Sequence, residues 1–545
     1  MKNRKYIFVM GGVLSGLGKG IAVSSIGLLL KSRGYRVTAL KIDPYVNVDA
    51  GTMNPTEHGE VFVTKDGLET DQDIGNYERF LNTELSRDNY MTTGAVYLSV
   101  IQKERNLGYK GKCVEVVPHI PEEVIRRIEL AGQKNKADIV LIEIGGTVGE
   151  YQNLLFLEAA RMMRLQRPDD IAFVLVSYLP IPSKIGEMKT KPTQYAVRTL
   201  NGAGIQPDFL LCRAEKPLDQ PRREKLAIFC NMKPANVLAA IDVDNIYNVP
   251  INYEKERLAE KILQLLNIAP RANTLSSWKR LLRNMDQATR PVRIGIVGKY
   301  FATGNFILAD SYISVIEAIK HAAWARHLKP ELHWINSEEF EKDPSAAKEL
   351  SRYDGIIVPQ GWGSRGAEGK ISAIRYIREH NIPYLGLCYG MQMAVIEFAR
   401  NVARLKGAHT LEADPKTPNP VIHIMPEQKE YLAKKQYGGT IRLGNWPCRL
   451  TPKTKTAAAY GTGVRTVQER HRHRYEFNMA YRKRLEDKGL VIAGTSPDGK
   501  LVEAIELRGH PFFVGTQFHP EYKSHPEAPH PLFLAFVKAC AVPKK

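Results

Sequence analysis

Cys388 stands between two glycines, in a pattern typical of a catalytic nucleophile. In Pro383-Tyr-Leu-Gly-Leu-Cys388-Tyr-Gly-Met-Gln392, an apolar run ends and a helical pattern begins. Gly-x-Cys-x-Gly at such a junction is a nucleophile elbow with Cys in place of Ser. The glycines permit the tight turn that exposes the sulfur, and the start of a helix favours the reactive thiolate. Cys388 is therefore predicted to attack a carbonyl group.

A base and an orienting acid follow in the order of an acyl-transfer triad. Phe518-His519-Pro520-Glu521 comes directly after an apolar run. His519 can take the thiol proton, and Glu521 can fix the tautomer of the imidazole. The glycine-rich segment 355–366 can offer backbone N–H groups to a tetrahedral oxyanion. A flexible surface loop is the alternative interpretation of that segment.

A second glycine-rich segment lies near the N-terminus. Gly11-Gly-Val-Leu-Ser-Gly-Leu-Gly-Lys-Gly20 stands between a strand pattern and a helix pattern. Glycines let N–H groups surround phosphate oxygens, the helix N-terminus adds positive potential, and Lys19 can neutralise terminal phosphates. The match to the usual P-loop is imperfect, because the first glycine is one residue early and Gly20 replaces the Ser or Thr that binds magnesium. A strand-to-helix turn without a ligand is the alternative.

Magnesium would then need other oxygen ligands. Asp71, Asp73 and Glu143 are candidates. Glu143 ends an apolar strand, where acids often hold the metal of a P-loop nucleotide but are also often structural. Lys189-Thr-Lys-Pro-Thr-Gln194 combines two cations, two hydroxyls and an amide at a proline-fixed turn, which indicates a further polyanion site. An exposed basic loop is the alternative for that segment.

Alternating apolar and helical patterns must position these residues. In the first half, strands are expected at 6–10, 37–42, 138–144, 171–177 and 209–212, with a helix at 21–30. The second half begins again, with strands at 293–297, 355–358, 384–387 and 512–516 and a helix at 310–321. Strands that alternate with helices indicate parallel sheets covered by helices, so the fold class is α/β.

Length and composition agree with two domains. A chain of 545 residues exceeds what one hydrophobic core usually serves. We expect an N-terminal domain at 1–267, a linker at 268–291 and a C-terminal domain at 292–545. Within the linker, Trp278, Leu281, Leu282 and Met285 have the spacing of one face of a short amphipathic helix.

Charge and cysteine usage narrow the partners and the compartment. The net charge of +19 comes from dispersed basic residues, so we assign it mainly to the surface and expect no nucleic-acid partner. The six cysteines form no Cys-x-x-Cys pair, which favours reduced thiols in the cytoplasm. No apolar run is long enough to span a bilayer, and no membrane partner is expected.

The chain resembles the CTP synthase family essentially from end to end. Matching stretches are 12–20, Lys41-Ile-Asp-Pro-Tyr45, Asn47-Val-Asp-Ala-Gly-Thr-Met53, His58-Gly-Glu-Val-Phe-Val63, 189–194 and Glu469-Arg-His-Arg-His-Arg-Tyr-Glu476. The Cys-His-Glu triad resembles that of class I glutamine amidotransferases. The resemblance implies an N-terminal P-loop amidoligase domain with a parallel sheet and a C-terminal class I glutaminase.

The resemblance also implies roles for individual residues. ATP would contact Gly16, Leu17, Gly18, Lys19, Gly20, Ile21, Asp73, Ile241, Asp242 and Val243, and magnesium would contact Asp73 and Glu143. UTP and CTP would share Ser15, Glu150, Tyr151, Gln152, Lys189, Thr190, Lys191, Pro192, Thr193, Gln194 and Lys225. Glutamine would contact Gly361, Tyr389, Gly390, Met391, Gln392, Glu412 and Arg474. His58 and Val61 would lie near the exit of an ammonia channel, with a packing role as the alternative for His58.

The implied reaction is the last step of de novo pyrimidine nucleotide synthesis. UTP, ATP, glutamine and water would give CTP, ADP, phosphate and glutamate, with ammonia passed between two sites. Mg²⁺ as cofactor, GTP as allosteric activator, CTP as feedback inhibitor and a homotetramer come with the same resemblance.

Three departures from the family pattern have expected consequences. Gly149-Glu-Tyr-Gln152 replaces Gly-Asp-Ile-Glu, and the missing acid at Gln152 weakens the expectation of feedback inhibition. Pro359-Gln-Gly-Trp-Gly363 replaces Pro-Gly-Gly-Phe-Gly beside the oxyanion hole, so we expect activity with altered packing around glutamine. Tyr389 replaces a usual Leu, and its N–H remains available.

Two other functions stay open at the level of sequence. One is a P-loop amidotransferase that activates a carboxylate, against which the 189–194 segment and Glu521 weigh. The other is a non-enzymatic P-loop switch that binds nucleic acid or membrane beside a decayed hydrolase. The intact Cys388, His519 and Glu521 weigh against the switch.

Overall fold

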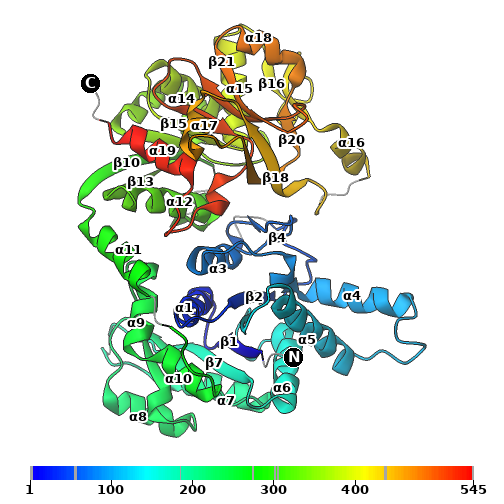
Figure 1. The fold of residues 1–545 in the computed structure, drawn as a ribbon, viewed down its shortest axis with the longest axis vertical. Coiled ribbons are helices and arrows are strands. Elements are labelled where there is room, and N and C mark those ends of the chain that lie inside the picture. The colour runs from blue at the N-terminus through cyan, green and yellow to red at the C-terminus, as the bar shows by residue number, and fades with distance from the viewer. Residues whose placement is uncertain are drawn as a thin grey trace. The chain divides into compact units, whose positions relative to one another are not determined.

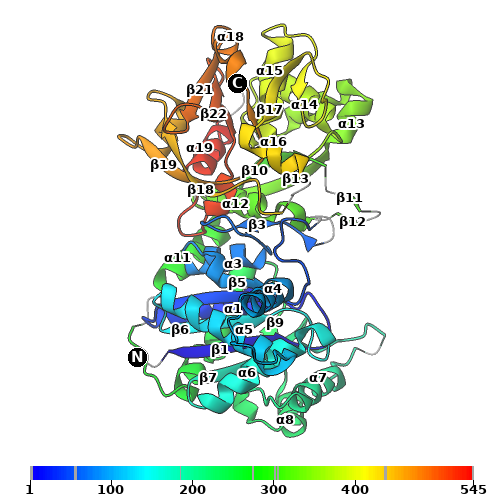
Figure 2. The same ribbon diagram turned by 90° about the vertical axis from the view of Figure 1, so that its right-hand side faces the viewer.

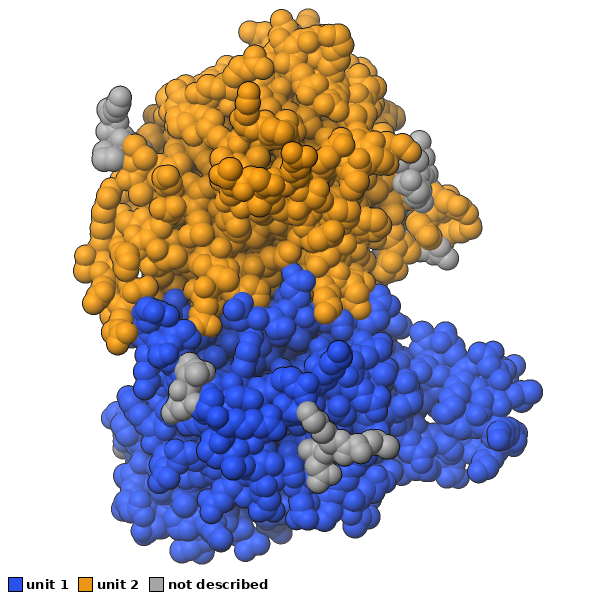
Figure 3. All heavy atoms as spheres, viewed as in Figure 1, with its two compact units in different colours: residues 1–50, 73–282 blue, residues 51–72, 283–545 orange. Residues whose placement is uncertain are grey.

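The computed structural model describes residues 4–53, 58–184, 186–272, 275–299, 302–303, 306–307, 309–434 and 438–542. The chain forms two compact units, unit 1 with residues 1–50 and 73–282 and unit 2 with residues 51–72 and 283–545 (Figure 3). Segment 51–72 interrupts unit 1 in sequence but makes its contacts in unit 2. The domain boundaries expected at 267 and 292 divide the chain by function, and they stay a prediction.

A seven-stranded parallel sheet forms the centre of unit 1, in the order β5-β2-β6-β1-β7-β8-β9. Its strands are β1 (Lys5–Gly11), β2 (Val37–Asp43), β5 (Tyr90–Thr92), β6 (Ile139–Ile144), β7 (Ile171–Tyr178), β8 (Phe209–Ala214) and β9 (Val237–Ile241). The five strands expected in this half are confirmed, and β5 and β9 are additional. Continuous burial along β1 and β6 is what a parallel sheet covered on both faces requires.

Helices cover both faces of this sheet. On one face α1 (Lys19–Ser32) contacts α3 (Asp73–Leu81), α9 (Val249–Lys255) and α10 (Leu258–Leu265). The other helices are α4 (Thr93–Arg105), α5 (Val116–Lys134), α6 (Leu154–Gln166), α7 (Lys191–Gly202) and α8 (Gln220–Phe229). Figure 1 shows α1 and α5 on opposite sides of β1, and Figure 2 brings α5 in front of the sheet. Because all strands of this sheet are parallel, their carboxyl ends lie at one edge, and the loops that follow the strands meet there.

Unit 2 contains a nine-stranded mixed sheet in the order β13-β10-β14-β15-β23-β22-β21-β18-β19. Its strands are β10 (Arg290–Gly298), β13 (Leu328–Asn336), β14 (Gly355–Val358), β15 (Tyr384–Leu387), β18 (Arg442–Leu450), β19 (Thr466–His473), β21 (Leu490–Thr495), β22 (Val502–Leu507) and β23 (Phe513–Thr516). The strands from β13 to β23 are parallel, and those beyond are antiparallel. The four strands expected in this half are confirmed.

Two separate hydrophobic clusters show that this second sheet is also covered on both faces. One cluster includes residues of α14 (Ala367–Glu379) and α15 (Tyr389–Asn401), and the other includes residues of α12 (Ile313–Trp324) and α19 (Pro531–Cys540). Shorter elements are α13 (Ser337–Lys342), β16 (Ala408–Thr410), β17 (Asn419–Ile424), α16 (Pro426–Ala433), α17 (Lys455–Tyr460), β20 (Tyr475–Phe477) and α18 (Arg482–Glu486). The α/β fold class is thus confirmed in both units.

Segment 51–72 folds as part of unit 2 and carries the hairpin β3 (Phe62–Val63) and β4 (Glu69–Thr70). Arg472 Nε lies 2.8 Å from Glu69 Oε1, and Arg470 donates to the carbonyl oxygen of Val63 at 2.9 Å. Tyr522 donates to the carbonyl oxygen of Val61 at 3.0 Å. These buried polar contacts attach the segment to β19 and to the turn after His519.

The expected linker helix is confirmed as α11 (Ser276–Gln287). Trp278, which is 1% exposed, donates its indole N–H to the carbonyl oxygen of Tyr247 at 2.9 Å. All six cysteines are free thiols, and only Cys113 is exposed. Among the helices of the described residues, none combines the length and apolar composition needed to cross a bilayer.

Candidate active sites

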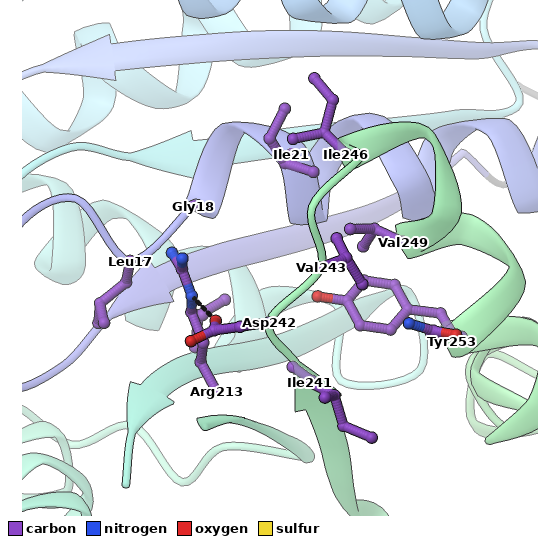
Figure 4. Close-up of a pocket in the computed structure, with 13 residues that line it drawn as sticks. Leu17, Gly18, Ile21, Arg213, Ile241, Asp242, Val243, Ile246, Val249 and Tyr253 are labelled. Carbon is purple, nitrogen blue, oxygen red and sulfur yellow. Dashed lines mark hydrogen bonds and ion pairs between the residues drawn. The ribbon is translucent and has the colours of Figure 1, made fainter. Parts of the chain in front are cut away.

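A small pocket in unit 1 brings together two distant segments assigned to ATP. It measures about 100 Å³ and is lined by Leu17, Gly18, Ile21, Val176, Arg213, Ala240, Ile241, Asp242, Val243, Ile246, Val249, Asn252 and Tyr253. Figure 4 shows the end of the glycine-rich loop facing the segment after β9 across this pocket. Arg213 bonds to Asp242 at 2.6 Å and donates to the carbonyl oxygen of Gly16 at 3.1 Å, so it ties both walls together. The apolar walls and polar ends suit a planar base.

Lys19 reaches back over the loop that carries it. Its Nζ donates to the carbonyl oxygen of Gly146 at 2.9 Å, and a Cβ on Gly11 would lie 2.8 Å from that nitrogen. Burial lowers the pKa of Lys19, and the charge of Glu143 opposes the shift. A buried ammonium group held at the mouth of a helix N-terminus is suited to a terminal phosphate.

Gly20 is explained by its neighbour Asp73. A Cβ added at Gly20 would lie 2.0 Å from Asp73 Oδ1. The Asp73 carboxylate therefore fills the space in which a P-loop Ser or Thr side chain would stand. The imperfect loop motif and the acid at position 73 are two parts of one arrangement.

Asp73 and Glu143 converge on a single cation. Lys41 Nζ lies 2.5 Å from Asp73 Oδ2, 2.7 Å from Glu143 Oε1 and 3.8 Å from Asp43 Oδ1. Burial raises the pKa of Glu143, and the charge of Lys41 opposes the shift. Tyr77 donates to the second oxygen of Glu143. Because their oxygens already share one cation, Asp73 and Glu143 fit a magnesium ion.

Magnesium would need further ligands from outside this pair. In the described parts of the chain, no group of three or more His, Cys, Asp or Glu side chains is arranged to hold a metal. Mg²⁺ commonly takes one or two carboxylates and completes its octahedron with water and substrate phosphates. Asp73 and Glu143 beside the phosphate loop match that pattern.

The residues assigned to UTP follow neighbouring strands of one parallel sheet. Ser15 follows β1, Glu150 to Gln152 follow β6, 189–194 begins α7 after β7, and Lys225 lies on α8 after β8. Since carboxyl ends of parallel strands share one edge, these segments meet there. A Cβ on Gly12 would lie 2.5 Å from Ala196 Cβ, which places the glycine-rich loop against α7.

The side chains of this group divide into buried supports and exposed cations. Thr193 is fully buried and bonds to Ser177 Oγ at 2.8 Å, and Gln194 donates to Thr190 Oγ1 at 3.1 Å. Lys191 and Lys225 are exposed, and Lys189 is half-buried and paired to Glu187. Tyr151 is 94% exposed. The exposed lysines are available for a polyphosphate, whereas Thr193 and Gln194 hold the turn.

In unit 2 the elbow of Cys388 is observed as expected from its sequence. Cys388 has φ 49° and ψ −99° and is the N-cap of α15. A non-glycine residue in such a conformation costs of order 1–3 kcal/mol, which the surroundings must offset. Its N–H donates to the carbonyl oxygen of Thr516 at 2.7 Å. Position 390 requires glycine because the backbone of Val358 comes close to it: a Cβ there would lie 2.0 Å from the carbonyl oxygen of Val358.

His519 and Glu521 lie beside that thiol as a buried pair. His519 Nδ1 is 2.7 Å from Glu521 Oε1, and its ring stacks on Tyr522 at 5.0 Å. Within the described residues, His519 Nε2 is buried without a hydrogen-bond partner. Burial lowers the pKa of His519, but the charges of Glu521 and Cys388 outweigh it and raise the pKa from 6.5 to about 10. Nε2 is therefore the nitrogen left for the thiol.

The residues assigned to glutamine present opposite charges. Glu412 Oε1 accepts from the N–H of Gly363 at 2.7 Å, and Arg474 bonds to Thr440 at 3.0 Å. Burial raises the pKa of Glu412, while its Gly363 bond and the charge of Arg474 oppose the shift. A carboxylate near a guanidinium is suited to the ammonium and carboxylate of a free amino acid.

The remaining glutamine residues surround the nucleophile. Gln392 donates to the carbonyl oxygen of Tyr475 at 2.9 Å, and Tyr384 donates to that of Gly390 at 2.9 Å. Met391 is fully buried in the core. Gly361 lies against Tyr389, because a Cβ there would be 3.7 Å from Tyr389 Cδ1.

Several polar residues at these sites were not singled out as site residues from the sequence. They are Arg213 and Tyr253 at the nucleotide pocket, Asp43 and Tyr77 at the acid pair, and Lys299, Lys370 and Gln517 near the thiol. Lys41 lies in one of the stretches that match the family, but no role at the site was assigned to it. Asp43 had a usable signal, since it ends an apolar strand as Glu143 does. The others carry no local pattern.

The fold and sites define an ATP-dependent amidotransferase, with a phosphate-loop unit and a triad-type glutaminase unit. The family model described as "CTP synthase N-terminus" matches residues 5–268, and that described as "Glutamine amidotransferase class-I" matches residues 307–539. The chain belongs to the CTP synthase family.

Two relatives agree with this membership over nearly their whole length. The chain is 52% identical over 536 residues to the CTP synthase of Gloeothece citriformis, covering 98% of this chain and 94% of that protein. It is 51% identical to the CTP synthase of a Picosynechococcus strain, covering 98% and 95% of the two chains. Among solved structures, the glutaminase domain of Trypanosoma brucei CTPS with bound acivicin is 36% identical, covers 46% of this chain and 94% of that chain, and has a TM-score of 0.43.

Proposed function

We propose that this protein converts UTP to CTP with ATP and glutamine. One observation carries the proposal: a single chain of the CTP synthase family holds both a buried Cys388–His519–Glu521 constellation and a phosphate loop with a convergent acid pair. Family membership also weighs against the carboxylate-activating enzyme and the non-enzymatic switch. ATP turnover with UTP, compared with turnover on carboxylates, separates the first of these alternatives from the proposal.

In unit 2 the chain would release ammonia from glutamine. Glu412 and Arg474 hold the amino-acid end, and Cys388 attacks the side-chain amide carbon. His519 donates its proton to the departing ammonia, and Glu521 keeps the imidazole oriented. The resulting thioester is hydrolysed by water, which gives glutamate and the free thiol.

In unit 1 the uracil C4 carbonyl must be activated, because its oxygen is a poor leaving group. Transfer of the ATP γ-phosphoryl group to O4 creates a good one, and ammonia then displaces phosphate at C4. Lys19 and the loop N–H groups offset the charge of that transfer. Bound Mg²⁺ on Asp73 and Glu143 would neutralise phosphate charge.

Ammonia needs a protected exit from the glutaminase, since in water at neutral pH it is mostly ammonium. A cavity of about 20 Å³ in unit 2 is lined by Glu60, Val61, Ser311, Tyr312, Gln360, Gly361, Trp362, Arg472 and Tyr522. This volume suffices for one water-sized molecule. We place the start of the ammonia path here, next to Val61. With glutamine labelled by ¹⁵N at its amide, release of most of the label as free ammonium during CTP formation would contradict a protected path. His58 is exposed, and its role stays a prediction.

The proposal is tested by following UTP-to-CTP conversion by absorbance with ATP and either glutamine or ammonium. No cytidine nucleotide from either nitrogen source would contradict it. Omission of Mg²⁺ should abolish the reaction, GTP should raise only the glutamine-dependent rate, and CTP should inhibit. Each omission or addition tests one of these further proposals separately.

The assembly and compartment are also proposals. The apolar residues Leu98, Ile101, Leu107, Val116 and Val117, on α4, on α5 and in the segment between them, are exposed in the single chain, which supports burial in a homotetramer. Light scattering that gives a monomer at assay concentration would contradict this. The free thiols support a cytoplasmic location, which fractionation of cells would test.

Glu521→Gln is expected to lower the pKa of His519, because burial then acts with less opposition. The rate of glutamine hydrolysis should fall roughly 10²-fold, since less imidazolium is present to protonate ammonia. Because the folded pKa of His519 is raised to about 10, the pair's contribution to stability is complete below pH 6.5 and is lost as pH rises through 10. NMR titration of the His519 ring measures the shift, and an unchanged pKa would contradict the assignment.

Gln152→Glu is expected to strengthen inhibition by CTP several-fold, the effect of about one hydrogen bond. The Gln152 amide donates to Glu150 Oε2 at 2.7 Å and so occupies an acceptor that CTP would use. A glutamate at position 152 has no N–H to donate, so the Glu150 oxygen becomes free. The substitution also restores the acid that the family pattern has at this position. The effect is measured as the CTP concentration that gives half-maximal inhibition, and the KM for UTP is measured for comparison. Weaker inhibition in Gln152→Glu would contradict a CTP site beside Glu150 and position 152.

A further inference from the structure

Side chains from other parts of unit 2 hold the backbone of Pro359-Gln-Gly-Trp-Gly363, called here the 359–363 loop. Four of its five carbonyl oxygens accept a hydrogen bond from a lysine or tyrosine side chain. Most loop carbonyls are satisfied by water or by neighbouring backbone. So many side chains directed at one short loop indicate that its orientation matters.

The first half of the loop is held from α14 and from the turn before α12. Lys370 donates to the carbonyl oxygen of Pro359 at 3.2 Å, and the Tyr312 hydroxyl donates to that of Gln360 at 3.4 Å. Lys370 is completely buried, and burial lowers its pKa well below the ordinary value. Burying a lysine is unfavourable, so its position needs a compensating role.

The second half is held from the residue that follows β10 and from the nucleophile helix α15. Lys299 donates to the carbonyl oxygen of Trp362, and the Tyr389 hydroxyl donates to that of Gly363 at 2.6 Å. Lys299 and Lys370 lie 5.4 Å and 5.2 Å from the centre of the Tyr389 ring. The ring next to the nucleophile therefore connects α15 and both lysines to the loop.

Fixing the carbonyl groups also fixes the N–H groups, because a trans peptide points them in opposite directions. The peptide from Trp362 to Gly363 shows this: its carbonyl accepts from Lys299, and its N–H donates to Glu412 at 2.7 Å. The same geometry applies to the peptide from Gln360 to Gly361. Because its carbonyl points toward the Tyr312 hydroxyl, its N–H, which belongs to Gly361, points away from Tyr312. Gly361 is the residue assigned to glutamine in this loop.

We propose that Tyr389, Lys370, Lys299 and Tyr312 form a clamp that orients the Gly361 N–H toward the oxyanion formed when Cys388 attacks glutamine. They are positioning residues, and the proposal rests on the glutaminase activity proposed above. Tyr389 has the clearest role, since its hydroxyl joins the helix of the nucleophile to the loop of the oxyanion donor. A leucine at this position would lack that bond.

Tyr389→Phe tests the clamp by removing one hydroxyl group. The kcat for glutamine hydrolysis should fall about tenfold, the effect of one hydrogen bond, with less change in KM. The aldehyde analogue of glutamine, which adds to Cys388 and places an oxyanion in the same position, should bind weaker by the same factor as kcat/KM. Glutamine binding measured in a Cys388→Ala background should change little.

Tyr460→Phe is the matched control, because that hydroxyl donates to Glu469 at 2.8 Å and not to the loop. Both variants should lose similar thermal stability, but only Tyr389→Phe should lose aldehyde affinity. Lys370→Met should repeat the Tyr389→Phe effect if it folds. Unchanged kcat and aldehyde affinity in Tyr389→Phe would overturn the clamp. A wild-type protein without glutaminase activity would instead overturn the proposed function.

Discussion

Cys388→Ala is expected to abolish glutamine-dependent CTP formation and to leave ammonia-dependent formation near the wild-type rate. Loss of a covalent nucleophile typically removes roughly 10⁶-fold of rate. The substitution removes one sulfur at the start of α15, which belongs to unit 2. Parallel absorbance assays with glutamine and with ammonium, at saturating ATP and UTP, measure both rates on one preparation.

Cys448→Ala provides the control for this experiment. Cys448 is fully buried in the same unit, and burial raises its pKa, so it is a packing residue without reactivity. It should keep both rates apart from a modest loss of stability. If Cys388→Ala lost the ammonia-dependent reaction as well, while remaining folded, the assignment of two separate chemistries to two units would be wrong.

Lys19→Ala is expected to abolish CTP formation from either nitrogen source. The ammonium group is buried above the glycine-rich loop and beside Glu143, where no other described side chain replaces its charge at the Gly146 carbonyl. Removing a preorganised charge from a transferring phosphoryl group should cost at least about 10³-fold. Product formation from UTP with ammonium, and ADP release under the same conditions, measure the loss.

Two measurements separate this effect from unfolding. Glutamine hydrolysis should persist in Lys19→Ala, because Cys388 and His519 belong to unit 2. Lys5→Ala removes another buried lysine of unit 1, one on β1 that is paired with Asp170 at 2.7 Å, and it should reduce stability without the same loss of rate. Synthesis from ammonium that survives in Lys19→Ala would remove Lys19 from phosphoryl transfer.

The elbow of Cys388 and the adjacent pair His519 and Glu521 could be predicted from the sequence, because each depends on residues a few positions apart. Glycines around a thiol at a strand-to-helix junction permit only a tight turn, and His519 and Glu521 share one turn of chain. The buried strands β1, β2, β6, β7 and β8 could be predicted for the same reason, but the fully buried β22 and the nine-residue β13 were not expected. The short β5 could not be predicted, since three residues carry too little pattern.

Arrangements between distant segments were decided by the tertiary structure. Lys41, Asp73 and Glu143 meet only because β2 and β6 are neighbours and α3 packs beside them. That contact also explains Gly20, whose missing side chain leaves room for Asp73. The membership of segment 51–72 in unit 2 depends on Arg470, Arg472 and Tyr522, far along the chain.

The sequence by itself therefore determined the reactive groups and their local turns, since short-range sterics and periodicity act within a few residues. Only the tertiary structure decided which charges share a site and which side chains clamp the 359–363 loop. Strand order and core packing bring those residues together, and no local pattern encodes either. Tyr389 shows the difference. The sequence shows only that a tyrosine replaces the leucine usual beside the nucleophile. The tertiary structure shows that its hydroxyl donates a hydrogen bond to the carbonyl oxygen of Gly363.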